Sequence, residues 1–204
     1  MVQSLDRMRE SPSQTAGPYV HIGCVPNFSG IPGVYLEDLG SSMVNDKTQG
    51  ERITITGRMF DGSGTPLKDA LIEIWQADHA GFYNSPSELR GTADPNFTGW
   101  GRQPTDMATG TYRFETVKPG RVPFVDGRLQ APHVSFWIVA RGINLGLNTR
   151  MYFDDEAAAN DEDPVLARIE HRVRVPTLIA RREDNTYHFD IRIQGEKETI
   201  FFDI

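Results

Sequence analysis

The segment HVSFWIVA, residues 133–140, decides the fold of this chain because it is apolar at almost every position. A short run that is apolar on both faces is typical of a strand buried in the middle of a sheet. Alternating patterns on either side of it would place it inside a β-sandwich. We therefore take it as a central strand and interpret the remaining sequence outward from it.

Other segments show strand patterns on both sides of this run. Residues 52–60 alternate Ile53 and Ile55 with Thr54 and Thr56, and a Gly-rich turn follows. The further strands that we predict are 70–77, 111–117, 150–153, 177–181, 186–193 and 199–202. About eight short strands separated by Gly and Pro turns predict an all-β fold, an antiparallel β-sandwich.

One short helix is expected to interrupt the strands. Asp163 can cap a helix, Pro164 suits its first position, and Val165, Leu166 and Ile169 form an apolar face.

Residues 1–50 differ in composition from the rest, being rich in Ser, Gly, Pro and Asn without a period of 2 or 3.6. They also hold apolar residues that a free tail would not need, among them Tyr19, Phe28 and Leu36. We predict that 1–50 form an extended N-terminal arm that packs on its own domain and on a partner chain. Residues 51–204 would form the β-sandwich domain.

Composition narrows the class of protein. The chain has 204 residues and a formal net charge of −7, which argues against a nucleic-acid binder. Its longest apolar run, 136–140, is far short of the ~18 residues of a membrane span. The N-terminus MVQSLDRMRE lacks the apolar centre of a secretory signal, and Cys24 alone cannot form an internal disulfide. A cytoplasmic protein without nucleic-acid or membrane partners is expected.

Few residues suggest chemistry by their spacing. None of the five histidines forms a metal-binding pair motif, and His133 shares a strand face with Ser135, whose hydroxyl is a poor metal ligand. Arg141 directly follows the buried run, at the rim of the predicted sandwich. Its guanidinium suits a carboxylate, although a salt bridge within the chain is the simpler interpretation.

Two runs of charge lie near the predicted helix. An acidic cluster covers 154–163, and a basic stretch follows it: Arg168, Arg172, Arg174, Arg181 and Arg182. Acidic residues are favoured at a helix start, and pairing within the chain explains the arginines more simply than an anion site does.

Several longer motifs are more specific. The segments GTPLKDALIEIWQAD (64–78), AGFY (80–83), TVKPG (116–120) and APHVSF (131–136) resemble the intradiol ring-cleavage dioxygenases. Within that family, SPSQTAGPYVHIG (11–23), ARGIN (140–144), TRMYFDD (149–155) and FDIRIQG (189–195) resemble the alpha-type chains of heteromeric members. The resemblance extends from about residue 11 to the C-terminus.

The resemblance implies a degenerate metal site. Catalytic chains of the family bind Fe(III) through two tyrosines and two histidines. Tyr83 and His133 match one ligand of each kind, whereas Val122 and Ser135 occupy the other two ligand positions. Gln130 stands where catalytic chains carry an arginine. The resemblance therefore implies no catalytic residue and no metal in this chain, with Fe(III) bound by a homologous beta chain.

The resemblance also implies a role for the arm. Thr15, Gly17, Pro18, Tyr19 and Arg141 match residues of the alpha-type chain that line the substrate pocket of the beta chain. The expected substrate is the small aromatic acid protocatechuate (3,4-dihydroxybenzoate), which the assembly cleaves with O2 to 3-carboxy-cis,cis-muconate. A higher-order alpha–beta multimer is expected.

Two alternatives remain. One is a stand-alone β-sandwich binding module without activity, since fold alone does not determine function. The other is a self-sufficient dioxygenase, which Val122 and Ser135 argue against because neither side chain can replace a phenolate or an imidazole.

Overall fold

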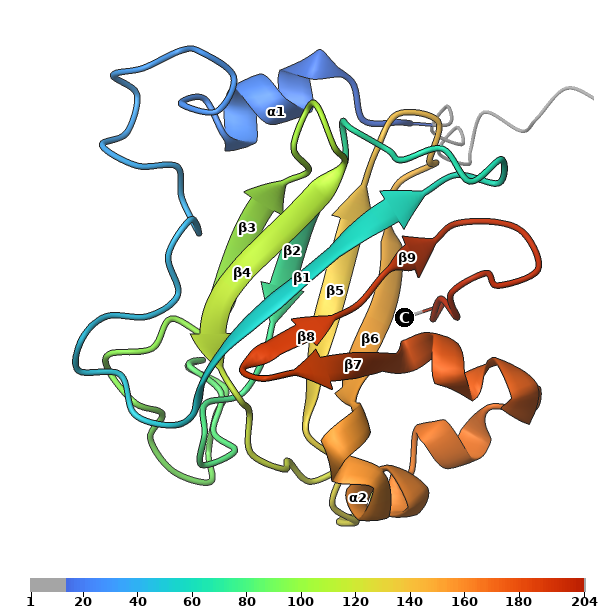
Figure 1. Ribbon diagram of the computed structural model, residues 1–204. Helices are drawn as coiled ribbons and strands as arrows, with labels where there is room; N and C mark the ends of the chain where they lie inside the picture. Colours follow the sequence, from blue (N-terminus) through green and yellow to red (C-terminus); the bar gives the residue numbers. More distant parts are fainter. Residues whose placement is uncertain (1–13, 204) are drawn as a thin grey trace, which may run out of the picture.

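A computed structural model describes residues 14–203, and strands dominate this part of the chain (Figure 1). The strands are β1 (Arg52–Phe60), β2 (Leu71–Trp75), β3 (Trp100–Pro104), β4 (Thr111–Val117), β5 (His133–Val139), β6 (Leu147–Phe153), β7 (Ile179–Glu183), β8 (Thr186–His188) and β9 (Ile191–Arg192). The predicted all-β fold is confirmed.

The strands form two layers that face each other. One layer has the antiparallel order β3-β2-β5-β6, and the other contains β4, β1 and β8. In Figure 1, β1 and β4 cross in front of β2, β3 and β5. Strand β7 pairs with both β6 and β8 and so joins the two layers into one continuous mixed sheet.

The predicted antiparallel sandwich also contains parallel pairs of strands. Strand β1 runs parallel to β8 and β9, and β6 runs parallel to β7. Parallel neighbours need a crossover connection rather than a hairpin. Residues 154–178 provide one between β6 and β7 as a series of helical turns.

The core lies between the layers. Strand β5 is bordered by β2 and β6, as its apolar sequence predicts, and Phe136 and Ile138 on it are 1% and 0% exposed. Ile53 and Ile55 of β1 face them from the other layer. Trp137 lies on the outer face of β5 and is 41% exposed, so this strand is not buried on both faces.

The single predicted helix is replaced by several short helical segments. They are α1 (Pro18–Cys24), α2 (Ala157–Glu162) and three 3₁₀ turns, η1 (Asp154–Glu156), η2 (Leu166–Arg168) and η3 (Arg172–Leu178). Asp163 ends α2 in an extended conformation because it precedes Pro164. Its carboxylate does act as a cap, but of η2, by accepting the N–H groups of Val165 and Leu166 at 2.8 Å.

One strand was not predicted, and one predicted strand is corrected. Strand β3 has the sequence WGRQP, which lacks the alternation of apolar and polar residues that predicts a strand. The predicted strand 199–202 contributes only an isolated bridge between Phe202 and Asn148.

The described part of the arm contacts the sandwich at a few buried residues, while most of its middle, residues 29–42, is exposed. Met43 is 2% exposed and packs in the main core, and Val44 forms an isolated β-bridge with Phe97. The arm is not uniformly extended, because α1 lies within it, near one end of the sandwich (Figure 1). Residues 1–13 of the predicted arm lie outside the described residues.

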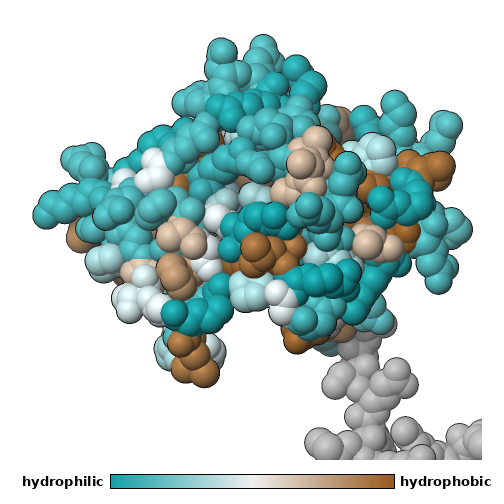
Figure 2. Space-filling view, turned by 90° about the horizontal axis from the view of Figure 1, so that it is seen from below, coloured by the Kyte–Doolittle hydropathy of each residue, from teal (hydrophilic) through white to brown (hydrophobic). Residues whose placement is uncertain are grey.

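The surface at the opposite end, beside α2, is mostly hydrophilic with separate apolar patches (Figure 2). No helix within residues 14–203 is long and apolar enough to cross a membrane.

Candidate functional site

The arm is attached to the loop that carries Arg141. Thr15 Oγ1 donates to the carbonyl of Ala140 at 3.3 Å and accepts from the N–H of Gly142 at 2.9 Å. Thr15 also forms an isolated antiparallel β-bridge with Asn144. The side-chain oxygen of Asn144 accepts the N–H of Gln14 at 3.0 Å. The two predicted motifs, TAGPY and ARGIN, are therefore brought together although more than 120 residues separate them.

Local sequence explains the conformation of the arm after Thr15. Gly17 is extended and precedes α1, whose first residue is Pro18, a residue suited to that position. Below this turn, Ala16 and Val25 pack with Leu71 and Val139 in a small separate apolar cluster. The cluster fixes α1 to β2 and β5.

A pocket of about 530 Å³ lies between α1 and this rim, and we call it the arm pocket. Gly17, Pro18 and Arg141 line it together with residues that sequence reasoning did not select, including His21 and Asp69. The Nε2 atom of His21 is buried and has no hydrogen-bond partner in the described part of the chain. Tyr19 is 83% exposed and does not line the pocket.

Arg141 forms the salt bridge that sequence reasoning considered. Its Nε lies 2.8 Å from Oδ2 of Asp69, while 75% of the arginine side chain stays exposed. The pairing follows from the β2–β5 register, in which Leu71 opposes Val139, so that Asp69 and Arg141 each lie two residues beyond that pair. The sequence alone could not reveal this register.

The degenerate ligand positions lie at the other end of β5. The loop that carries Tyr83 is held by the buried carboxylate of Asp78, which accepts the N–H groups of Ala80 and Phe82 at 2.9 Å. Gly81 packs against the next motif so closely that a Cβ there would lie 2.3 Å from the carbonyl oxygen of Arg121. This contact brings the AGFY and KPG motifs together.

Tyr83 and Val122 line one shallow pocket, and Tyr83 stacks on Trp75 with ring centroids 5.9 Å apart. Burial raises the pKa of the Tyr83 phenol, so the phenolate is disfavoured. Val122 is buried and contributes no donor atom.

His133 and Ser135 lie on β5, where Ser135 opposes Trp75, the residue on which Tyr83 stacks. The Nδ1 atom of His133 lies 2.8 Å from the carbonyl oxygen of Ala131. Burial, followed by the nearby positive charge of Arg150, lowers the pKa of His133 to about 4, so the imidazole is neutral near pH 7. Ser135 is only partly buried and lines a different pocket from Tyr83.

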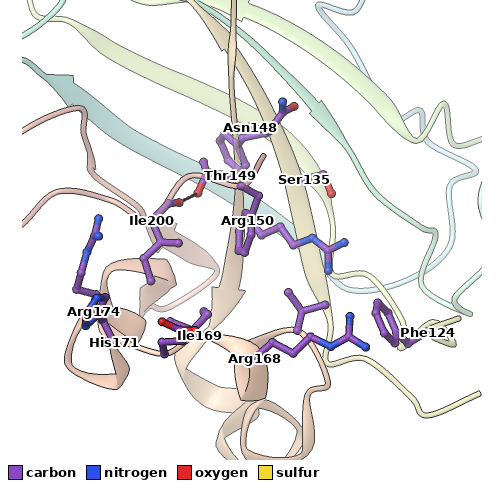
Figure 3. A pocket seen from close by; sticks show the side chains of 14 residues that line it. Phe124, Ser135, Asn148, Thr149, Arg150, Arg168, Ile169, His171, Arg174 and Ile200 are labelled. Atoms are coloured by element: carbon purple, nitrogen blue, oxygen red, sulfur yellow. Dashed lines mark hydrogen bonds between the residues drawn. The ribbon is translucent and has the colours of Figure 1, made fainter. Parts of the chain in front are cut away.

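Arg150 is the residue of this region that sequence reasoning missed. It opposes Ser135 in the β5–β6 ladder, and its Nη1 donates to Oε1 of Gln130 at 2.8 Å. The positive charge of Arg150 tends to lower the pKa of both Tyr83 and His133. A guanidinium anchored by Gln130 thus lies near three of the four predicted ligand positions, Tyr83, His133 and Ser135. Only the pairing of β5 with β6 shows that Arg150 lies opposite Ser135 (Figure 3).

These positions offer one phenol and one imidazole, a set that does not fit Fe(III). In the described residues no group of three or more His, Cys, Asp and Glu side chains could hold a metal ion.

Comparison with known proteins places this geometry in context. A family model described as "Dioxygenase" matches residues 26–195. The chain is 43% identical over 203 residues to the protocatechuate 3,4-dioxygenase alpha chain of Pseudomonas putida, covering 98% of both chains. It is 34% identical over 182 residues to a protocatechuate 3,4-dioxygenase beta chain of Burkholderia cepacia, covering 80% of this chain and 76% of that one.

Solved structures show the same fold. Hydroxyquinol 1,2-dioxygenase from Pseudomonas putida DLL-E4 superposes with a TM-score of 0.57 at 20% identity, covering 75% of this chain and 59% of that one.

Proposed function

Because this chain belongs to the intradiol dioxygenase family, we propose that it is the alpha subunit of a heteromeric protocatechuate 3,4-dioxygenase. The assembly would cleave protocatechuate with O2 to 3-carboxy-cis,cis-muconate. One observation carries the proposal. Similarity to alpha chains covers almost the whole chain, yet Val122 and Ser135 remove two donor positions.

This chain would hold no iron. Two donors remain at the degenerate positions, and one of them, Tyr83, is stabilised as the neutral phenol. Hard ferric iron favours anionic oxygen ligands, and the Arg150 guanidinium would repel the cation. The Fe(III) that the family uses would therefore be bound by the partner beta chain, where the oxygen chemistry would occur.

The arm pocket would be this chain's contribution to the shared site. The backbone of Gly17 borders open space, since a Cβ added there would meet no atom within 4 Å. Thr15 attaches the turn to the loop that carries Arg141 by accepting the N–H of Gly142. Arg141 would bind the carboxylate of protocatechuate, because most of its side chain is exposed and its Asp69 partner can be exchanged for another carboxylate. Bound in this way, the aromatic ring would be oriented toward the beta chain.

The arm would also form much of the interface with the beta chain. Large apolar side chains are exposed along it, including Tyr19, Val34 and Leu36 at 83%, 57% and 105%. Exposed apolar residues concentrated in one segment mark an interaction surface. A higher-order alpha–beta multimer and a cytoplasmic location, the latter consistent with the single Cys24, are part of the same proposal.

The proposal is tested by expressing the chain alone and together with a homologous beta chain. We expect the isolated chain to contain no iron and to be inactive, and the co-expressed chains to co-purify with stoichiometric iron in the beta chain and to cleave protocatechuate. Iron and turnover in the isolated chain would contradict the proposal. Failure to associate with the beta chain would favour a stand-alone binding module.

A further inference from the structure

The loop between β5 and β6, residues 140–146, holds a leucine in a backbone conformation that leucine rarely adopts. Leu145 has a φ of 60°. This left-handed region brings Cβ close to the backbone and disfavours every residue except glycine and, to a lesser degree, Asn and Asp. Within residues 14–203, every other residue with a positive φ is a glycine, apart from Asp184.

The arm holds the backbone of Leu145 in this conformation. The N–H of Leu145 donates to the carbonyl of Gln14 at 2.9 Å. Beside this bond, Thr15 forms its β-bridge with Asn144 and accepts the N–H of Gly142. None of these contacts uses the side chain of residue 145, so a glycine at this position would preserve all of them.

The Leu145 side chain gives the described chain nothing in return. It is 68% exposed and belongs to none of the buried apolar clusters within residues 14–203. The same loop has glycine at its two other restricted positions. Gly142 has a φ of 85°, and a Cβ on Gly146 would lie 2.5 Å from Nε1 of Trp137. Leucine at 145 therefore combines backbone strain with apolar surface left in water, and both effects disfavour the free chain.

The position of the loop indicates what the side chain serves. The loop lies at the same end of the sandwich as α1 (Figure 1), and it carries Arg141, which lines the arm pocket. Two apolar side chains that also line this pocket, Ile22 and Met107, are 39% and 62% exposed. Exposed apolar side chains gathered around one pocket mark a surface that another protein covers.

We propose that Leu145 is an anchor residue for the beta chain, which would receive the leucine side chain in an apolar recess next to the shared site. The inference rests on the proposed function, in which the beta chain covers the arm pocket. Arg141 of the same loop would contact the substrate there, so a partner close enough to share that substrate also lies over Leu145. Burial of the side chain in the complex would offset the strain that the free chain carries.

The test compares Leu145→Gly with the native chain in two measurements. Glycine relieves the backbone strain, so the melting temperature of the isolated full chain should rise by about 2–4 °C. Loss of the apolar side chain should raise the Kd for the beta chain about 10- to 150-fold, measured by sedimentation velocity on mixtures of separately purified chains. A residue that only supported the fold would not change the two quantities in this combination.

Three further variants separate the side chain from the backbone. Asp184→Gly is the matched control, because Asp184 has a φ of 56° but does not line the arm pocket, and it should leave the Kd unchanged. Leu145→Asn suits the left-handed conformation but is polar, and it should weaken binding as Leu145→Gly does. Leu145→Met stays apolar and should bind the beta chain more tightly than either of them.

The outcomes distinguish this inference from the proposed function. Failure of the native chain to bind the beta chain overturns both. Equal binding by the native chain and Leu145→Gly overturns the anchor alone. A lower melting temperature in Leu145→Gly also overturns it, since the leucine would then pack within its own chain. Self-association of the isolated chain that Leu145→Gly abolishes would assign the leucine to a second copy of this chain and overturn the beta chain as its partner.

Discussion

Replacing Arg141 by Ala in the assembled enzyme tests the proposed role of the arm pocket. In this chain the Arg141 guanidinium pairs with Asp69 at 2.8 Å, and the arginine side chain is 75% exposed. An exposed pair of this kind stabilises a protein by about 0.2–1 kcal/mol. The substitution should therefore change the free energy of unfolding by no more than about 1 kcal/mol.

The effect on substrate binding should be larger. A hydrogen bond between a guanidinium and a substrate carboxylate in a closed site stabilises the complex by about 1.5–3 kcal/mol. Its loss corresponds to a KM for protocatechuate raised about 10- to 150-fold. Asp69→Asn should act in the opposite direction, because Asp69 competes with the substrate for Arg141, and should lower KM about 1.4- to 5-fold.

Initial rates of O2 uptake, measured over a range of protocatechuate concentrations, give kcat and KM. Catechol, which lacks the carboxylate, is the matched substrate, and Arg141→Ala should leave its KM unchanged. Arg113→Ala, which breaks an exposed ion pair with Glu115 on β4, is the matched variant. An unchanged KM for protocatechuate in Arg141→Ala, or an equal loss with catechol, would refute the role of Arg141.

Three further predictions concern stability. Asp163→Asn should lower the free energy of unfolding by about 3 kcal/mol in urea titrations, because an amide cannot accept all the buried N–H groups that the carboxylate accepts, whereas Asp126→Asn at the surface should change it little. His133 has a pKa lowered to about 4, so the unfolded state binds more protons between pH 6.5 and 4. Stability should fall by up to about 3 kcal/mol as pH drops through that window, and His133→Gln should lack this slope. Gly57→Ala should lower the free energy of unfolding by about 3 kcal/mol, and with it the melting temperature, because the new Cβ would lie 1.9 Å from the carbonyl oxygen of Phe189. An unchanged melting temperature would contradict this packing.

Local patterns predicted most of the strands. The alternation in 52–60 and the apolar run at 133–140 became β1 and β5, because side chains on a strand alternate between faces and the core selects the apolar ones. Strand β3 carries no such pattern. It forms because its backbone pairs with β2, an interaction that leaves no trace in its own sequence.

The degenerate ligand positions could be named from sequence because each lies inside a long motif. Tyr83, Val122, His133 and Ser135 were identified in this way, and their roles remain predictions. Arg150 could not be recognised, since its importance comes from lying opposite Ser135. A one-residue change of register would place a different side chain there.

By itself, the sequence determined the strand content and the family, and it predicted the loss of two ligand positions, because these depend on residue identity and short-range spacing. Only the tertiary structure decided which charges meet. It paired Arg141 with Asp69 and placed Arg150 opposite Ser135, where it donates to Gln130. The physical reason is that ion pairing requires a separation of a few ångströms between residues far apart in the chain. Strand register and the crossover after β6 determine that separation.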